Sequence, residues 1–542
     1  MKLIPFFLLI AFLSYAQDYS VEILKPQKGK TQGADYIGLD NNGNLYTASM
    51  KISGLIFVSE YLKVIDPASG RIISEVKLGN NKNLKKAGYD YVDIRVIRGE
   101  LVLICKNKKS KEPYFLLGIS LDDNGNFVGA PFRIAEVGEC GSLFNRNNSL
   151  PWSFSDAEGE NESHFFLSEI SCQKDKFREY RFIELDQMND YINDFSFKIE
   201  LDNIVDYSVL PYGNHLYYSS VTIENQKIEG KLFKQNRLVN KLFKIDINTL
   251  EVEEIDLYEG IDPIYAGRIV LDRLDDKVLI SGQMMEEKGF TGVFTAQLDT
   301  ATNEFSAIKT NIFPREFVTK FWSSKKKQKD DKKQSRKGDK YEEPSFNTNF
   351  KLMETHETED GGQISIYQKY AKRTVTRTST SSDGGASTTT DDYYSYGDAM
   401  FIKTDTTGKL KYVKLLPFNQ TTKNYDPGKS FVSMAKDNQF YIIHDSNKEL
   451  HDKIINEENS DEKQRIKDRM SRYYSITRID ENGKITTEQV LDRKETKISG
   501  EAIHLLNIAA NTERGEFILL TPVYKMAAFN RRKTKLVRFS IN

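Results

Sequence analysis

The chain has 542 residues, of which 39% are hydrophobic and 29% are charged, and it contains 28 Tyr and 32 Phe. This aromatic content is too high for a largely disordered chain, and the length exceeds one ordinary domain of roughly 100–200 residues. The 77 Lys and Arg residues balance 78 Asp and Glu residues, so the charge favours neither nucleic acid nor an anionic membrane as a partner. Three Cys and six His leave little material for a metal cluster or a disulfide-rich scaffold.

The first 16 residues, MKLIPFFLLIAFLSYA, have the pattern of a secretory signal peptide. Small residues, Ser14 and Ala16, occupy positions −3 and −1 of a cleavage site before Gln17. The apolar run is shorter than the ~20 residues that a membrane-spanning helix needs, and no later stretch is apolar enough to span. We therefore predict that residues 1–16 are removed and that the mature chain, 17–542, has no transmembrane segment.

A short pattern recurs along the mature chain: an apolar strand ends in an acid, turn residues that often include Gly follow, and a second strand begins. Seven copies carry their acid at Asp66, Asp122, Asp186, Asp246, Asp299, Asp405 and Asp480, and residues 536–542 begin an eighth copy. A second hairpin-like unit precedes each copy, as LDNNGNLYTA does at 39–48. Two hairpins per repeat give four antiparallel strands, so the sequence predicts an all-β, eight-bladed β-propeller.

The eighth repeat stops at its turn and lacks a fourth strand, whereas residues 19–25 (YSVEILK) form a strand that no repeat uses. The simplest closure places this N-terminal strand on the outside of the last blade. An open solenoid would leave unpaired edges. A seven-bladed ring is the alternative if one divergent repeat is an insertion.

Three insertions interrupt the single propeller domain, at 321–345, 372–394 and 445–470. Each falls in a connector between blades or between the second and third strands of a blade, positions that emerge on the same face of a propeller. The first carries nine Lys or Arg against three Asp over 325–340, which indicates a solvated loop rather than an anion site. The second alternates Thr with other residues toward an Asp-Gly turn, which is typical of a projecting hairpin, with a flexible Ser/Thr linker as the alternative. The third contains a capped-helix pattern at 460–470.

The turn acids resemble the start of a calcium-binding EF-hand loop at 40–44 and 122–126. The pattern does not continue, because the Gly required at position 6 is Leu45 or Phe127 and the Glu required at position 12 is Lys51 or Arg133. We interpret these segments as turns. No G-x-S-x-G, H-E-x-x-H, Walker or C-x-x-C motif occurs, so the sequence assigns no catalytic, metal or cofactor-binding residues.

The three cysteines fall into two groups. Cys140 and Cys172 lie near turns on the insertion-bearing face, and they would pair in an oxidising compartment. Cys105 ends an apolar run and is expected to be a buried thiol. The alternative to a Cys140–Cys172 bridge is three free thiols.

The SYA-Q end of the signal and two segments of the sixth repeat, ETEDGG at 357–362 and GDAMFIKTDTTGKLKYVKLLPF at 397–418, resemble uncharacterised secreted propeller-like proteins of Bacteroidota. The resemblance implies a periplasmic or surface location and no chemistry. Two turns, Asp299-Thr300-Ala301 and Asp405-Thr406-Thr407, also resemble the short O-glycosylation signal of secreted Bacteroidota proteins.

Two functions from different classes fit these features. The first is a non-catalytic binding or scaffold protein that docks an envelope or outer-membrane protein complex. Its aromatic anchors on the insertions would be Trp322, Tyr393, Tyr394 and Tyr396. The second is a carbohydrate-active hydrolase or lyase that uses the central funnel. The insertions favour the first function, unless they are loop expansions without a role. The sequence leaves the oligomeric state open.

Overall fold

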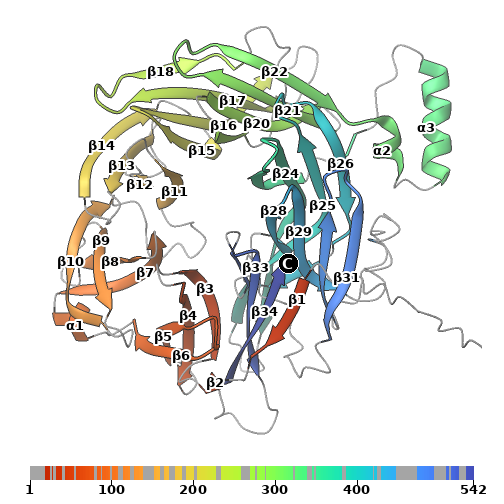
Figure 1. Cartoon of the computed structure of the whole chain (residues 1–542). Coiled ribbons are helices and arrows are strands. Elements are labelled where there is room, and N and C mark those ends of the chain that lie inside the picture. The colour runs from red at the N-terminus through yellow and green to blue at the C-terminus, as the bar shows by residue number, and fades with distance from the viewer. Residues whose placement is uncertain are drawn as a thin grey trace, which may run out of the picture.

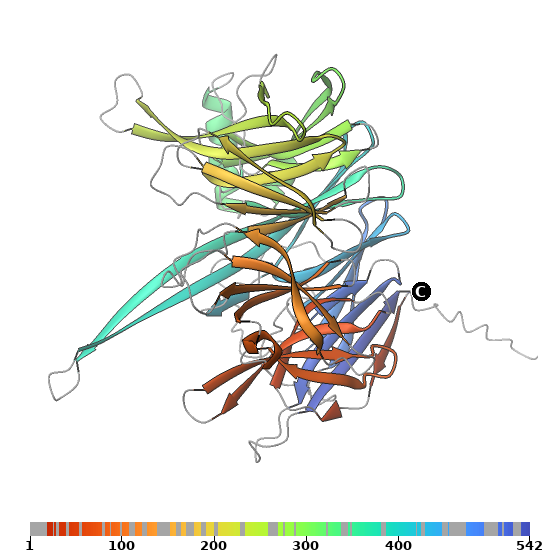
Figure 2. The same ribbon diagram turned by 90° about the vertical axis from the view of Figure 1, so that its left-hand side faces the viewer.

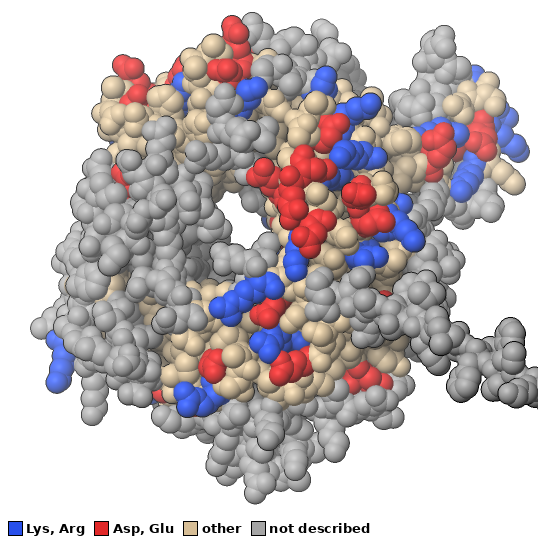
Figure 3. Space-filling view, in the orientation of Figure 1, with Lys and Arg blue, Asp and Glu red and all other residues tan. Residues whose placement is uncertain are grey.

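The structure is a computed structural model that describes residues 19–541 with gaps, the longest of which are 138–151, 258–268, 455–472 and 493–507. The described strands form eight antiparallel sheets. In Figure 1 the sheets follow one another around a central opening, which the space-filling view of Figure 3 also shows. The fold is therefore all-β and propeller-like, as the repeats predict.

The first four sheets are meanders in which each strand pairs with the next one along the chain. Sheet 1 contains β3 (Gln32–Leu39), β4 (Leu45–Ser53), β5 (Phe57–Ile65) and β6 (Ile72–Lys77). Sheet 2 follows a short helix, α1 (Lys82–Lys86), and contains β7 (Tyr89–Ile97), β8 (Glu100–Asn107), β9 (Tyr114–Leu121) and β10 (Phe127–Val137). Sheet 3 contains β11 (Trp152–Glu158), β12 (His164–Glu169), β13 (Arg178–Leu185) and β14 (Tyr191–Ile199). Sheet 4 contains β15 (Ile204–Tyr212), β16 (His215–Lys227), β17 (Lys234–Asp246) and β18 (Val252–Ile255).

Sheets 5 and 7 repeat this order, and so do the first four strands of sheet 6. Sheet 5 contains β19 (Ile269–Leu274), β20 (Lys277–Glu286), β21 (Gly289–Asp299) and β22 (Phe305–Ile312). The helices α2 (Arg315–Lys320) and α3 (Ser324–Lys337) then lead to sheet 6, which contains β23 (Phe350–Glu357), β24 (Gln363–Thr380), β25 (Ala386–Thr404), β26 (Leu410–Leu416) and β27 (Gln420–Lys423). Sheet 7 contains β28 (Phe431–Lys436), β29 (Gln439–Ser446), β30 (Tyr473–Ile479) and β31 (Ile485–Asp492).

Sheet 8 joins the two ends of the described chain. It contains β32 (Ile508–Asn511), β33 (Glu516–Val523), β34 (Lys533–Ile541), β1 (Tyr19–Ile23) and the two-residue β2 (Gln27–Lys28). The N-terminal strand β1 runs antiparallel to β34, with Tyr19 opposite Ile541 and Ile23 opposite Val537. The pairing predicted for residues 19–25 is therefore present in this sheet.

The hydrophobic core lies between neighbouring sheets rather than in one central mass. Phe197 of sheet 3 and Tyr218 of sheet 4 share one cluster, for example, and their rings meet edge to face with centroids 6.1 Å apart. Leu45 of sheet 1 shares a cluster with Leu536 of sheet 8, and Leu24, just after β1, packs against it. Each sheet thus buries its apolar faces against its neighbours, which is how a repeat architecture exceeds the size limit of a single core.

The first two insertions are described in part. Residues 324–337 form the helix α3, so the prediction of a solvated loop at 325–340 was wrong for most of this segment. Lys, Gln and Arg are good helix formers, and the helix contains no Gly or Pro. At 372–394 the predicted hairpin is confirmed: β24 and β25 continue as a two-stranded ribbon that projects beyond the sheets in Figure 2. The helix predicted at 460–470 lies outside the described residues.

Candidate functional site

The turn between the third and fourth strands of a sheet is built around the repeated acid. Asp246 accepts hydrogen bonds from the backbone N–H of Asn248 at 2.8 Å and of Thr249 at 2.9 Å. Asp299, Asp405 and Asp480 accept bonds of the same kind. These amide donors lower the pKa of the Asp246 and Asp299 carboxyls. The acids therefore act as turn residues, as predicted, and no group of three metal-ligating side chains occurs in the described part of the chain.

Two of these turns also fasten their sheet to the sheet before it. Lys244 of sheet 4 donates from Nζ to the backbone O of Thr300 at 3.1 Å, in the turn of sheet 5. In the same way, Gln297 of sheet 5 donates from Nε2 to the backbone O of Thr406 at 3.0 Å, in the turn of sheet 6. Each donor lies two residues before the turn acid of its own sheet. Each acceptor lies one residue after the turn acid of the following sheet. The two Thr residues named as glycosylation candidates thus hold the contact between sheets with their main chain.

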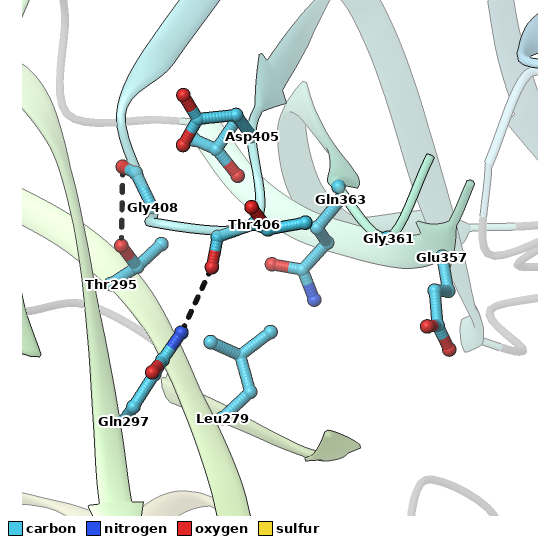
Figure 4. A pocket seen from close by; sticks show the side chains of 11 residues that line it. Leu279, Thr295, Gln297, Glu357, Gly361, Gln363, Asp405, Thr406 and Gly408 are labelled. Atoms are coloured by element: carbon cyan, nitrogen blue, oxygen red, sulfur yellow. Dashed lines mark hydrogen bonds between the residues drawn. The ribbon is translucent and has the colours of Figure 1, made fainter. Parts of the chain in front are cut away.

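A small pocket with a cavity volume of about 20 Å³ lies at the junction of sheets 5 and 6 (Figure 4). Leu279, Thr295 and Gln297 line it from sheet 5, and the two turns of sheet 6 close it with residues that include Glu357, Gln363 and Asp405. Several polar groups of the lining are engaged in holding the sheets together. Thr295 donates to the backbone O of Gly408 at 3.3 Å, and Gln363 accepts a bond from Ser281 at 2.7 Å.

A buried lysine organises the turn beside this pocket. Lys403, 2% exposed, places Nζ 2.6 Å from Oδ1 of Asp360, and Lys411 places Nζ 2.9 Å from Oδ2. Burial alone would raise the pKa of Asp360, but hydrogen bonds from Lys403, Thr358 and Lys411 outweigh it and hold the pKa far below its ordinary range. This network was not predicted from the sequence, although both of its segments, ETEDGG at 357–362 and FIKTD at 401–405, lie in the sixth repeat. The network stabilises a turn and leaves Asp360 ionised, so it is poorly suited to acid catalysis.

The ribbon of β24 and β25 carries the second candidate surface. Thr374 donates to Asp392 at 2.6 Å, and the pairs Thr376/Thr390 and Thr378/Thr388 face each other at 3.4 and 3.5 Å. These cross-strand contacts fix the register of a ribbon made almost entirely of polar residues. The ribbon is therefore an ordered extension and not a flexible linker.

Three of the four predicted aromatic anchors lie at the base of this ribbon. Tyr393 and Tyr394 are half-buried, with the Arg373 guanidinium carbon 5.8 Å from the first ring centroid and Lys372 Nζ 5.3 Å from the second. Tyr396 is only 1% exposed and packs on Tyr370 with ring centroids 5.4 Å apart. Its prediction as an exposed anchor was wrong, because its register position turns the ring into the sheet interface. The fourth anchor, Trp322, lies outside the described residues.

The basic helix α3 is attached to α2 through its two acidic residues, Asp330 and Asp331. Arg315 of α2 places Nη2 2.9 Å from a carboxylate oxygen of Asp330 and 2.9 Å from one of Asp331. The exposed side of the helix carries Lys329, Lys332, Lys333 and Arg336. In Figure 1 the helix stands at the periphery of the molecule.

The remaining predicted positions are tested only in part. Cys105 is a buried thiol, as predicted. Cys140, Cys172, Ala16 and Gln17 lie outside the described residues. Within the part of the chain that the structure describes, no helix is long and apolar enough to cross a membrane.

Known proteins resemble this chain only distantly. No family model and no curated protein matches the chain. Among solved structures, the WD40 domain of SCAP from fission yeast matches with a TM-score of 0.39 and 8% identity, over 96% of this chain and 98% of that chain. A Synechocystis apocarotenoid oxygenase mutant matches at 0.31 and 8%, over 86% and 92%. A thermostable family-43 glycoside hydrolase matches at 0.22 and 10%, over 62% and 88%. These likenesses are too distant to carry an argument about function.

Proposed function

We propose that this chain is a non-catalytic binding or scaffold protein of the cell envelope. It engages a protein partner through the insertion-bearing face of an eight-bladed propeller that β1 closes. The eight described sheets, the pairing of β1 with β34 and the cluster shared by sheets 1 and 8 support the closed ring. The signal-peptide pattern of residues 1–16 supports export to the periplasm, where an outer-membrane complex is the expected partner.

The ribbon is the observation that carries the proposal. A two-stranded extension is marginally stable on its own in water, yet here it is registered by Thr and Asp contacts and stiffened at its base by Tyr393 and Tyr394. Aromatic residues beside cationic side chains are typical anchors of protein interfaces. An ordered polar arm that reaches beyond the sheets is suited to contacting another protein.

A competing function is hydrolysis or cleavage of a carbohydrate in the central funnel. It would need converging acids, one of which holds a proton near neutral pH. Among the described residues around the pocket, Asp360 is held in two ion pairs and Asp405 in a hydrogen-bonded turn. Neither of these two acids is suited to holding a proton near neutral pH, so we do not propose this second function.

The test shortens the ribbon and measures partner capture from envelope extracts of the native host. Residues 374–392 are replaced by Asn-Gly, which joins Arg373 to the opposite Tyr393 through a two-residue turn. The matched control replaces residues 225–236 of the β16–β17 hairpin by Asn-Gly, between the opposed Glu224 and Arg237. We expect both variants to fold and only the first to lose the co-purifying complex. If the partner stays bound to the shortened ribbon, the assignment is wrong.

A further inference from the structure

The ribbon of sheet 6 has an open edge along β24. The preceding strand, β23, stops pairing at Phe350, opposite Lys369. Beyond that point, no described strand pairs with the outer side of residues 371–380. The other edge is different, because β27 adds to β25 from Tyr393 to Tyr396. The base of the ribbon therefore already accepts a third strand on one side.

The open edge presents main-chain groups rather than an apolar surface. Side chains from 371 to 378 are exposed except for the half-buried Val375. Alternate main-chain N–H and C=O groups of an edge strand point outward and can pair with an added strand. An extended partner segment would complete a three-stranded sheet, which is the smallest arrangement that is usually stable in water.

The charge along this edge is of one sign. Residues 371–380 contain Lys372, Arg373 and Arg377 and no acid. Lys372 is paired with Asp392, 3.2 Å away. Arg373 and Arg377 lie on the opposite face of the ribbon, four residues apart, with Val375 between them. An added strand with acids four residues apart would place a carboxylate opposite each Arg.

The same charges disfavour a second copy of this chain at the edge. Two β24 edges related by a two-fold axis through Val375 would place Arg373 of each copy opposite Arg377 of the other. Like charges directly opposite each other destabilise a pair of strands. The edge therefore selects a different protein over self-association.

We propose that the outer edge of β24, residues 371–380, binds an extended acidic segment of a partner protein by strand addition, with alternate-face acids opposite Arg373 and Arg377. This inference rests on the proposed function and specifies the chemistry of its partner. Main-chain hydrogen bonds supply the affinity, and the two Arg side chains supply the selection.

The experiment uses the full mature chain and two labelled peptides. The first is Thr-Glu-Thr-Val-Thr-Glu-Thr, and the second has Lys in place of both Glu. Binding is followed by fluorescence anisotropy up to about 1 mM peptide, because the dissociation constant of a short, unanchored strand is expected to lie in this range. We expect saturable binding of the acidic peptide, at least about tenfold stronger than that of the basic peptide. Absence of saturable binding by the acidic peptide overturns the inference.

A charge exchange separates strand addition from general attraction. The R373E/R377E variant should prefer the basic peptide, whereas the control K332E/R336E, which removes two exposed cations from α3, should keep the original preference. Hydrogen exchange with bound acidic peptide should slow at 371–380. An unchanged preference in R373E/R377E contradicts the inference. If shortening the ribbon releases the native partner and R373E/R377E does not, the proposed function stands and strand addition at this edge is wrong.

Discussion

Deleting residues 19–25 tests the closure of the ring directly. The deletion removes the whole pairing of β1 with β34, in which five residue pairs are in register. It also removes Leu24, whose N–H donates to the backbone O of Leu536 at 3.0 Å and whose side chain packs on the cluster between sheets 1 and 8. The variant therefore exposes a strand edge and loosens a contact between sheets at once.

The expected loss follows from the ladder. Antiparallel pairing gives roughly one main-chain hydrogen bond per residue pair, and each contributes a net ~1 kcal/mol, so the five pairs contribute about 5 kcal/mol. The entropy of unfolding is about 2.1 cal/mol/K per residue, or about 1.1 kcal/mol/K for 542 residues. If the chain unfolds as one unit, the melting temperature should fall by about 5 °C.

Differential scanning calorimetry of the mature chain measures this shift. Removal of residues 17 and 18 alone is the matched control and should leave the transition in place. A synthetic peptide of residues 17–26, added in excess, should restore much of the lost stability, because it can occupy the vacated edge of β34. A melting curve that is unchanged by the deletion would refute the reasoning.

Three further predictions address local features. Gly408→Ala should destabilise the chain by about 2 kcal/mol or more in urea titrations, because the residue has φ +76° and a Cβ would lie 2.2 Å from a side-chain oxygen of sheet 5; Gly88→Ala, at φ +86° with open space, should lose less. Asp360→Asn should weaken the decrease of the unfolding free energy at acidic pH. The depressed pKa of Asp360 in the folded state contributes stability above the ordinary pKa of 3.8, and this stability is lost as the pH falls below 3.8. An equally steep decrease in the variant contradicts this. Arg315→Ala should speed hydrogen exchange across α3, whereas Arg336→Ala on its exposed side should not.

The sequence was most informative where a repeat imposes local rules. An acid followed by turn residues marks the same turn at Asp246, Asp299 and Asp405, because its carboxylate bonds the backbone two residues later. Alternating Thr residues and an Asp-Gly turn were sufficient to predict the ribbon. Both signals depend only on residues close in the chain.

Features that depend on distant partners were missed. The helix α3 was interpreted as a loop because its cations repel one another along the sequence. Arg315, which lies outside the insertion, forms ion pairs with the two acids of the helix, Asp330 and Asp331. Tyr396 was predicted as a partner-binding anchor because the sequence alone does not give the pairing register. The register decides which face a strand residue occupies, and a shift of one residue would turn Tyr396 outward. The link from Gln297 to Thr406 joins residues 109 positions apart.

The pairing of β1 with β34 also determines how the protein responds to mechanical tension. Tyr19 and Ile541 are opposite each other at the same end of an antiparallel ladder. A force that pulls these two ends apart acts across the hydrogen bonds and opens them one pair at a time, like a zipper, so that all five never share the load. A tether at both ends would therefore open the molecule first at this seam, while the contacts between the other sheets remain unloaded.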